Sequence, residues 1–277
     1  MTNSAEWIGR VGRAWADEWR RTDRAFASLT RTLVASLDAT APQEGRALDI
    51  GCGAGETAIA LADLRPRLAI TGADISEDLL AAARGRSERP NLDFVAGDAV
   101  AAAAAVAPID LYLSRHGVMF FPDPLAAFTA FHASAAPGAH LVFTCFRDWS
   151  LNSFARDFAP LFGEAPPPAD QPGPFAFADE ARVSDMLAKA GWTGIQAEPV
   201  DFAFRAGEGP DPVADAVAFL SRIGPAARAL LEMAEADRPK LLEAVAGICQ
   251  ARLAGGTVDF PAAAWLWTAT ALPKGTP

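Results

Sequence analysis

The stretch Ala47 to Ala62, ALDIGCGAGETAIALA, constrains the fold more than any other part of the chain. It begins with a short apolar run that predicts a buried strand and continues through glycines at positions 51, 53 and 55. It ends in an apolar-periodic segment, 57–64, that predicts a helix. Glycine permits a sharp turn and lets a ligand approach the backbone, which a Cβ would block. A strand, a glycine loop and a helix are therefore expected here, with a ligand site at the loop.

The spacing of these glycines bears on the kind of ligand. The dinucleotide fingerprint G-x-G-x-x-G is missed, because position 56 is Glu56. Asp49 lies just before the turn, where its carboxylate can accept a hydrogen bond from an ammonium group. The backbone N–H groups of the loop can receive a carboxylate. The loop is thus better suited to an amino-acid-like group than to a phosphate.

Acidic residues follow the next two predicted strands. The strand over 68–73 ends at Asp74, and the strand over 92–97 ends at Asp98. In a parallel sheet these ends share the carboxyl edge with Asp49, which is where ligands bind in such folds. Asp74 is placed to accept both hydroxyls of a ribose, with Ile75 against an adenine. The alternative for Asp74 is an N-cap for the helix expected over 76–86.

With these residues in place, the chain resembles a known family. LDIGCGAG resembles the first motif of class I S-adenosylmethionine-dependent methyltransferases. The run from SRHGVMFFPDP to PGAHLVFTCFRDWSLN is similar to bacterial small-molecule methyltransferases of the ubiquinone- and menaquinone-biosynthesis-like group. The resemblance covers residues 44–204 and the last strand. It implies a doubly wound Rossmann-like α/β sheet of seven strands with an antiparallel last strand, and S-adenosyl-L-methionine as cofactor.

The resemblance also assigns cofactor contacts. An acidic residue at position 98 would accept a hydrogen bond from the adenine amino group while the N–H of Ala99 contacts the ring, and Ser114 would approach the methionine part. Asp98 is alternatively a simple cap for the helix over 99–107. The expected cofactor-binding residues are Asp49, Gly51, Cys52, Gly53, Asp74, Ile75, Asp98, Ala99 and Ser114.

The segment after the fourth strand, 109–113, is the acceptor side in the resembled family. His116 is the candidate general base, because a neutral imidazole can take a proton from an attacking group. The alternative is a histidine that packs and bonds locally. In the resembled group an apolar aromatic is expected at this position, so His116 points to a different acceptor. Arg115 either recognises an acidic or carbonyl group or braces the loop.

Aromatic residues are the candidate walls of the acceptor pocket. Trp15 and Phe120 are expected there, and Trp149 opens a Phe- and Pro-rich segment over 150–174. Further apolar walls are expected from Phe154, Phe158 and Phe162. The alternative is an apolar patch that covers the sheet or makes a dimer contact.

The chain is expected to be a single methyltransferase domain over 1–277. Residues 1–40 form an N-terminal helical lid, with an amphipathic helix over 5–37 that carries Trp7, Trp15, Trp19 and Phe26 on one face. The cofactor-binding core spans 44–204. A helical insertion over 205–258 precedes the last strand, 259–272, and is a candidate surface for a homodimer.

Composition excludes several classes of protein. A net charge of −10 argues against broad gripping of nucleic-acid phosphates. The three cysteines lack metal-ligand spacing, so no metal site is expected and the thiols are interpreted as reduced, in a cytoplasmic protein. No stretch reaches the roughly 20 apolar residues of a membrane helix, so no membrane insertion is expected.

The sequence therefore predicts an enzyme that transfers a methyl group to an O, N or C atom of a small acceptor that is hydrophobic or aromatic. Two alternatives remain at this stage. A nicotinamide-dependent oxidoreductase would share the fold but needs its third glycine one place later. A non-catalytic cofactor-binding or scaffold protein would keep Asp74 and Asp98 but would gain nothing from a pocket-facing His116.

Overall fold

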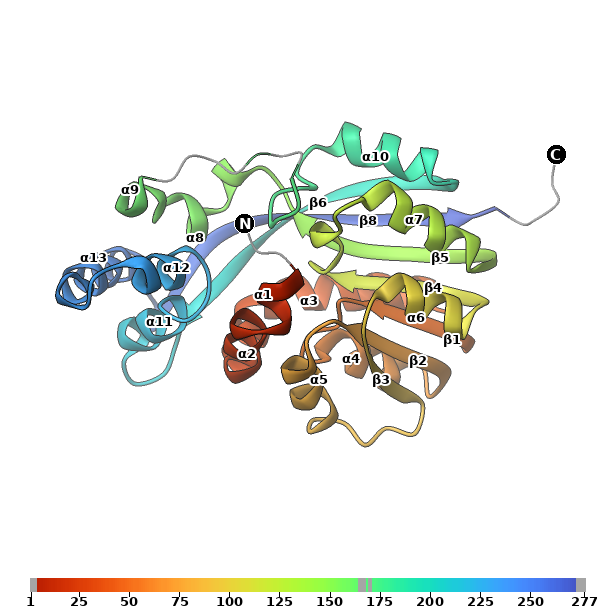
Figure 1. Cartoon of the computed structure of the whole chain (residues 1–277), viewed down its shortest axis with the longest axis horizontal. Helices are drawn as coiled ribbons and strands as arrows, with labels where there is room; N and C mark the ends of the chain where they lie inside the picture. Colours follow the sequence, from red (N-terminus) through yellow and green to blue (C-terminus); the bar gives the residue numbers. More distant parts are fainter. Residues whose placement is uncertain (1–3, 164–167, 169–170, 273–277) are drawn as a thin grey trace.

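A computed structural model describes residues 4–163, 168 and 171–272 and contains one mixed sheet (Figure 1). Its order is β3-β2-β1-β4-β5-β8-β6, with β7 paired to β8. The strands are β1 (Glu44–Ile50), β2 (Arg67–Asp74), β3 (Leu92–Ala96), β4 (Ile109–Arg115), β5 (Ala135–Phe146), β6 (Trp192–Gly207), β7 (Leu253–Ala254) and β8 (Thr257–Ala271).

The pairing directions confirm the predicted fold class. Strands β1 to β5 are parallel, whereas β8 is antiparallel to both β5 and β6. The eighth strand arises because β7 pairs with the start of β8 across Gly255 and Gly256. Both glycines have positive φ, +59° and +83°, as a two-residue hairpin turn of type I′ requires.

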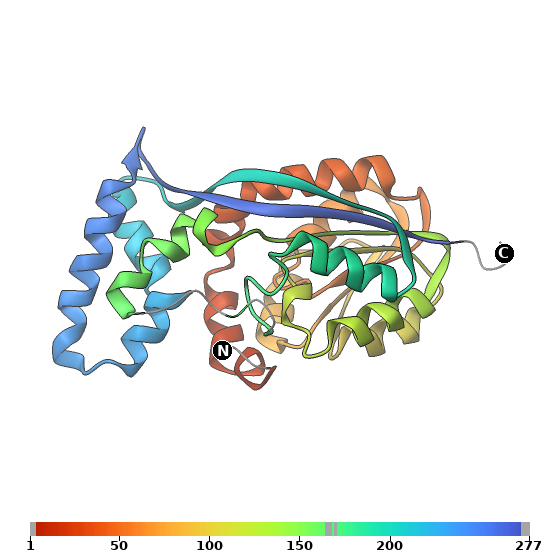
Figure 2. The same ribbon diagram turned by 90° about the horizontal axis from the view of Figure 1, so that it is seen from above.

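Helices cover both faces of the sheet. They are α1 (Ser4–Ile8), α2 (Arg10–Asp17), α3 (Trp19–Thr40), α4 (Glu56–Leu64), α5 (Glu77–Arg84), α6 (Ala99–Val106), α7 (Pro124–Ala133), α8 (Ser153–Arg156), α9 (Ala159–Phe162), α10 (Glu180–Lys189), α11 (Pro212–Leu220), α12 (Pro225–Glu232) and α13 (Arg238–Ala251). Three short 3₁₀ turns are η1 (Val118–Phe120), η2 (Trp149–Leu151) and η3 (Glu235–Asp237). In Figure 2, α3 lies on one side of the sheet and α7 and α10 on the other.

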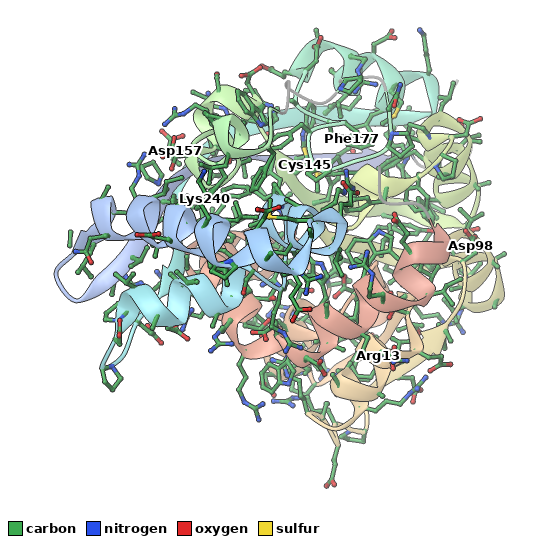
Figure 3. The ribbon with its side chains drawn as sticks, turned by 60° about the vertical axis from the view of Figure 1, so that its left-hand side comes forward. Arg13, Asp98, Cys145, Asp157, Phe177 and Lys240 are labelled. Atoms are coloured by element: carbon green, nitrogen blue, oxygen red, sulfur yellow. The ribbon has the colours of Figure 1, made fainter. Side chains whose placement is uncertain are left out.

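The apolar core has two parts, one on each face. Leucines of α3 and α4 pack with Leu111 and Leu113 of β4. On the other face, aromatic side chains of β4, β5 and α7 form the larger cluster, in which the polar groups of Tyr112 and Cys145 meet backbone carbonyls. The Tyr112 hydroxyl donates to the Phe131 carbonyl at 2.8 Å. The thiol of Cys145 lies 3.5 Å from the carbonyl oxygen of Phe177, and Figure 3 labels both residues.

The N-terminal segment, predicted as one helix over 5–37, is three helices. The breaks lie at Gly9 and Glu18. Helix α2 packs on α5, and the approach is close: a Cβ on Gly12 would lie 2.2 Å from Oγ of Ser76 and 2.1 Å from the carbonyl oxygen of Trp7. This contact brings α2 to the end of β2, beside the predicted ribose site.

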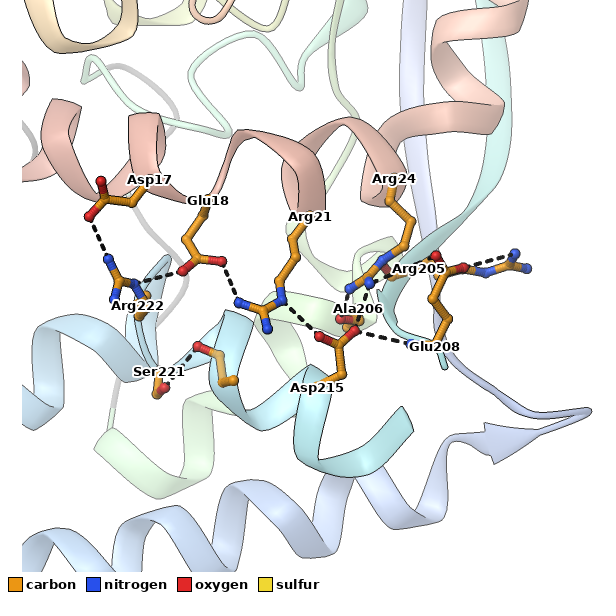
Figure 4. Close-up of polar contacts among 11 residues, drawn as sticks. Asp17, Glu18, Arg21, Arg24, Arg205, Ala206, Glu208, Asp215, Ser221 and Arg222 are labelled. Atoms are coloured by element: carbon orange, nitrogen blue, oxygen red, sulfur yellow. Dashed lines mark hydrogen bonds and ion pairs between the residues drawn. The ribbon is translucent and has the colours of Figure 1, made fainter. Parts of the chain in front are cut away.

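The helical insertion before the last strand is confirmed as α11 to α13. Strands β6 and β8 are long, and their far ends carry these helices away from the rest of the sheet (Figure 2). A chain of ion pairs joins α11 to the N-terminal helices (Figure 4). Asp215 accepts from Arg21 at 2.8 Å and from Arg24 at 2.6 Å, and Arg222 pairs with Glu18 at 2.7 Å. The insertion is therefore held against the segment predicted as a lid.

The sequence alone predicts a helix over 124–136 that Pro137 and Gly138 close, and this boundary is wrong. Helix α7 ends at Ala133, and β5 begins at Ala135. The pairing of β4 with β5 shifts between Ile109↔Ala135 and Leu111↔His140, so the Pro-Gly pair lies in an irregular stretch of strand. A proline is tolerated there because no ladder hydrogen bond is required of its nitrogen.

None of the helices in the described part of the chain is long and apolar enough to cross a membrane. The three cysteines are free and buried, and the same part of the chain holds no cluster of side chains that could bind a metal ion.

Candidate active site

A cavity of about 270 Å³ lies at the carboxyl ends of β1, β2, β3 and β4, beneath the N-terminal helices. Most of the predicted site residues line it, namely Gly51, Cys52, Gly53, Asp74, Ile75, Asp98, Ala99, Trp15, Arg115, His116 and Phe120. Asp49, Ser114 and Trp149 are not among its lining residues. The topology thus brings together residues from four strand ends and from a segment that precedes the whole sheet.

The glycine loop has the sharp turns that its sequence predicts. Gly51, Gly53 and Gly55 have φ of +64°, +55° and +84°, which other residues rarely adopt. A Cβ on Gly51 would come within 2.9 Å of the Cα of Gly117, so the loop packs tightly on the turn after β4. Gly53 faces open space instead, since no atom lies within 4 Å of the place of its Cβ.

Asp49 lies under this loop and is fully buried. Its Oδ2 accepts a hydrogen bond from the Thr57 hydroxyl at 2.5 Å, and no described residue offers a partner to Oδ1. Burial raises the pKa of Asp49 to about 7, although Thr57 and Arg115 act in the opposite direction. A buried carboxylate that lacks a full set of donors would be stabilised by a cation at the loop.

The acidic residues after β2 and β3 both bind backbone N–H groups. Asp74 accepts from Gly53 through one oxygen and from Ser76 through the other, each at 2.9 Å. Burial raises the pKa of Asp74, and these bonds oppose the rise. Asp98 is exposed and caps α6 by accepting from Val100 and Ala101. The capping alternative is therefore realised for Asp98 but not for Asp74, because α5 is capped by Ser76, whose hydroxyl accepts from the N–H of Leu79. A carboxylate oxygen with a second lone pair can still accept from a ligand.

Ser114 holds the turn after β4 rather than facing the cavity. Its hydroxyl donates to the carbonyl of Ile50 at 2.7 Å and accepts from the N–H of Gly117 at 3.1 Å. The side chain is fully buried. Ser114 thereby ties the end of β1 to the turn that carries His116.

His116 is the one described residue other than glycine with positive φ, +63°. Its Nδ1 lies 3.0 Å from Oγ1 of Thr144, and its ring packs edge-on against Phe146 with centroids 4.1 Å apart. Nε2 is enclosed and has no polar partner within the described chain. Burial and the nearby Arg115 lower the pKa of His116 to about 3, so the ring is neutral at physiological pH.

Arg115 braces the site through two carboxylates. Its guanidinium donates to Glu56, at the start of α4, and lies 3.6 Å from Asp23 of α3. Asp23 also accepts from Arg86 at 2.6 Å, and Arg86 in turn donates to the carbonyl of Ala54 in the glycine loop at 2.7 Å. Asp23 therefore connects α3 to both sides of the cavity.

The N-terminal helices contribute an aromatic wall. Trp7, Trp15 and Trp19 all line the cavity, with Phe26 deeper inside. Trp7 contacts Trp15 and Phe120, with ring centroids 5.7 Å and 5.3 Å apart. Trp15 lines the cavity, as its sequence pattern predicts. Asp23 was not predicted, because its only signal in the sequence is its place among the charged residues between these aromatics. Trp7, Trp19 and Phe26 could have been found from the stripe that they share with Trp15.

Trp149 lines a second cavity of about 370 Å³. This cavity lies between α1, α2, the segment after β5 and the start of α12, and it shares Trp7, Trp15, Phe120 and Pro174 with the first. Of the other predicted aromatic walls, Phe154 stacks on Phe204 with centroids 4.6 Å apart, and Phe158 packs against Phe260. Phe162 packs against the main core. None of these three borders either cavity.

The chain is similar to known methyltransferases. Residues 47–138 match the model of a methyltransferase domain. The chain is 30% identical over 136 residues to trans-aconitate 2-methyltransferase of Variovorax paradoxus, covering 49% of this chain and 48% of that protein. It is 27% identical over 175 residues to demethylmenaquinone methyltransferase of Beutenbergia cavernae, covering 58% and 71%. The chain thus spans about half the length of the first of these curated relatives.

The fold has solved counterparts. One is phosphoethanolamine N-methyltransferase 2 of Haemonchus contortus, in complex with phosphomonomethylethanolamine and S-adenosylhomocysteine. It superposes with a TM-score of 0.51 at 16% identity, over 87% of this chain and 52% of that one. These likenesses confirm the resemblance drawn from the glycine loop: residues 47–138 are a methyltransferase domain, and the chain has the fold of the class I S-adenosylmethionine-dependent methyltransferases.

Proposed function

We propose that the protein transfers a methyl group from S-adenosyl-L-methionine to an O, N or C atom of a small hydrophobic or aromatic acceptor. One observation carries the proposal. A single cavity joins the glycine loop and the strand-end carboxylates to His116 and to an aromatic wall from the N-terminal helices. The first group of residues suits the cofactor, and the second suits an acceptor beside it.

The residues of the cavity fit this cofactor in shape. Gly53 and Gly97 both line it, and a Cβ at either position would project into open space. These backbones can therefore lie directly against a ligand, as a nucleoside held at the edge of a parallel sheet requires. Asp74 is the candidate partner of the ribose hydroxyls, Ile75 of the adenine face, and Asp98 with Ala99 of the adenine edge.

The charge of the cavity also fits S-adenosyl-L-methionine. Its lining holds three carboxylates, Asp23, Asp74 and Asp98, against one cation, Arg115. A sulfonium and an ammonium are both cationic, so an acidic site with aromatic faces favours them. Asp49, with one oxygen lacking a partner, is the candidate support for the ammonium beneath the loop.

When bound, the cofactor would supply a sulfonium-activated methyl group, which an acceptor atom attacks in line as the bond from methyl carbon to sulfur breaks and S-adenosylhomocysteine leaves. The protein's part is then to align the two molecules and to exclude water. The lid aromatics and Phe120 exclude water above the site. Arg115 is already neutralised by Glu56 and Asp23, so its proposed role is to hold the turn rather than to bind an acidic acceptor.

His116 is the proposed acceptor-side residue. A ring with a pKa of about 3 is neutral and only weakly basic. We therefore infer that His116 orients the acceptor through a hydrogen bond and does not fully remove its proton. Nε2 becomes available for this role once Phe146 or Phe26, which pack against the ring, move aside for an acceptor.

The proposal is tested by calorimetric titration of the full chain with S-adenosylmethionine, S-adenosylhomocysteine and NAD. We expect micromolar binding of the two sulfur compounds and none of NAD. Asp74→Asn should weaken binding about tenfold or more, because it replaces a carboxylate that holds the loop and faces the ribose. Asp63→Asn is the matched control, since Asp63 is exposed, pairs with Arg89 and borders neither cavity.

Each other outcome selects a different function. Binding of NAD alone would assign an oxidoreductase. Binding of the sulfur compounds without methyl transfer to any member of a broad acceptor panel would favour a cofactor-binding scaffold. Homodimerisation through residues 211–254 remains a separate prediction, which light scattering of the full chain and of a variant without that stretch tests.

A further inference from the structure

The second cavity has a charge opposite to that of the protein. The chain carries a net charge of −10, yet this cavity is lined by Arg10, Arg222 and Arg228 against Glu6 as its one acidic residue. The first cavity has the reverse balance, three carboxylates against Arg115. The two cavities share an aromatic wall, but the charged residues that line them are mainly acidic in the first cavity and mainly basic in the second.

The cations of the second cavity are not equally available. Arg222 is held by Asp17 at 2.6 Å and by Glu18 at 2.7 Å, as Figure 4 shows. In contrast, the guanidinium groups of Arg10 and Arg228 have no hydrogen bond or ion pair with any residue that the structure describes. They come from two different helices that border the cavity, α2 and α12.

A third donor without a partner lies on the shared wall. Nε1–H of Trp7 is buried and meets no acceptor in the described chain. A buried N–H that lacks an acceptor is costly, and such groups are rare unless a ligand or water completes them. Trp7 borders both cavities, so an acceptor oxygen that reached Nε1 would lie at the wall that the two cavities share.

We propose that the second cavity binds the anionic end of the methyl acceptor. The acceptor would have an aromatic or other apolar body, which packs on Trp7, Trp15 and Phe120, and an anionic oxygen group, a carboxylate or a phosphate, which Arg10 and Arg228 bind. Its methyl-accepting atom would lie at the other end, in the first cavity beside His116. This inference rests on the proposed methyltransferase function and adds the chemical class of the acceptor.

The test uses three probes of one shape: 1-naphthoate, 1-naphthyl phosphate and the neutral 1-naphthol. Each is titrated by calorimetry into the full chain saturated with S-adenosylhomocysteine. We expect at least one anion to bind about tenfold more tightly than 1-naphthol, because charge-assisted hydrogen bonds to guanidinium are worth that much. The anion that is preferred identifies the group as carboxylate or phosphate.

Variants locate the site. Arg10→Gln/Arg228→Gln should remove the preference for the anion and leave the affinity for S-adenosylhomocysteine unchanged. Arg13→Gln is the matched control, because Arg13 lies on the same helix as Arg10, is 74% exposed and borders neither cavity. Trp7→Phe removes the indole N–H but keeps an aromatic wall, so it should weaken binding of the preferred anion several-fold.

Two results would overturn the inference: no preference for either anion over 1-naphthol, or a preference that survives in the double variant. These are distinct from failure of the proposed function, which would appear as absent binding of S-adenosylhomocysteine to the wild-type chain. In that case the three naphthyl probes are titrated without it, and an anion preference that depends on Arg10 and Arg228 would still establish the site.

Discussion

Nδ1 of His116 lies 3.0 Å from Oγ1 of Thr144, and this contact fixes the imidazole at a turn where its backbone φ is +63°. The N–H of His116 also donates to the carbonyl of Thr144 at 3.0 Å. The residue is therefore held twice to β5, with its ring between Phe26 and Phe146. A ring fixed in this way can orient an acceptor, but it is poorly solvated when charged.

The first prediction concerns the protonation of His116. Because burial lowers its pKa to about 3, the imidazole should stay neutral from pH 8 to pH 5. NMR of ¹⁵N-histidine-labelled protein, with His116→Gln to assign the signal, measures this directly. A titration midpoint near the ordinary value of about 6.5 would contradict the prediction and restore a conventional general base.

The same shift has a consequence for stability. Below about pH 6.5 the unfolded histidine binds a proton that the folded one does not, so the free energy of unfolding falls as the pH drops toward 3. The slope is at most about 1.4 kcal/mol per pH unit. His116→Gln lacks this slope, so urea unfolding at pH 7 and pH 5 should show the wild type losing more stability than the variant. An equal loss in both proteins would count against the lowered pKa.

Much of the fold could be predicted because its signals are local. The apolar run before Gly51, the glycines themselves and the acidic residues that follow β2 and β3 each mark the end of a strand. Parallel pairing then brings those ends to one edge. The core of the candidate cofactor site follows from this rule without any knowledge of side-chain positions.

The parts that could not be predicted depend on distant contacts. Asp23 looks like one of several charges on a helix face, and only the structure shows it between Arg86 and Arg115. The Pro137–Gly138 pair is typical of a helix end, but pairing with β4 draws the chain into β5. Trp149 borders the second cavity and not the one that holds His116, a division of the aromatic residues that no sequence pattern indicates.

The second prediction concerns Asp49, whose pKa is raised to about 7 by burial. Between about pH 4 and pH 7 the folded state binds more protons here than the unfolded state. The stability contributed by this group therefore falls as the pH rises through that window, by at most about 1.4 kcal/mol per pH unit. Asp49→Asn keeps an acceptor for the Thr57 hydroxyl without the buried charge.

Relative to wild type, Asp49→Asn should gain stability as the pH rises from 5 to 8, which urea unfolding measures at both values. The same variant should bind S-adenosylmethionine more weakly by calorimetry, since it can no longer offer a charge to the ammonium. A stability difference that does not change with pH would contradict the raised pKa.

The third prediction tests the link that Asp23 makes. Asp23→Asn should weaken binding of S-adenosylhomocysteine about tenfold, because it frees Arg86 from α3 and leaves Arg115 with one carboxylate. Asp23→Glu should recover part of the affinity. The control is Asp215→Asn, which removes a carboxylate that also joins two arginines, Arg21 and Arg24, but borders neither cavity. Equal losses in the two variants would indicate general destabilisation.

The last prediction concerns the contact of α2 with α5. A Cβ on Gly12 would overlap the Trp7 carbonyl and the Ser76 hydroxyl, so Gly12→Ala must push α2 away from the end of β2. Because Asp74 accepts from the N–H of Ser76, this displacement should weaken S-adenosylhomocysteine binding and increase the solvent exposure of Trp15. Calorimetry and tryptophan fluorescence measure these two effects.

Gly247→Ala is the matched control for Gly12→Ala, since a Cβ on Gly247 in α13 would meet no atom within 4 Å. Alanine at this position should stabilise the helix by about 0.4–1 kcal/mol. If Gly12→Ala binds as the control does, α2 is not a rigid part of the site, and the aromatic wall that it carries must close only when an acceptor is bound.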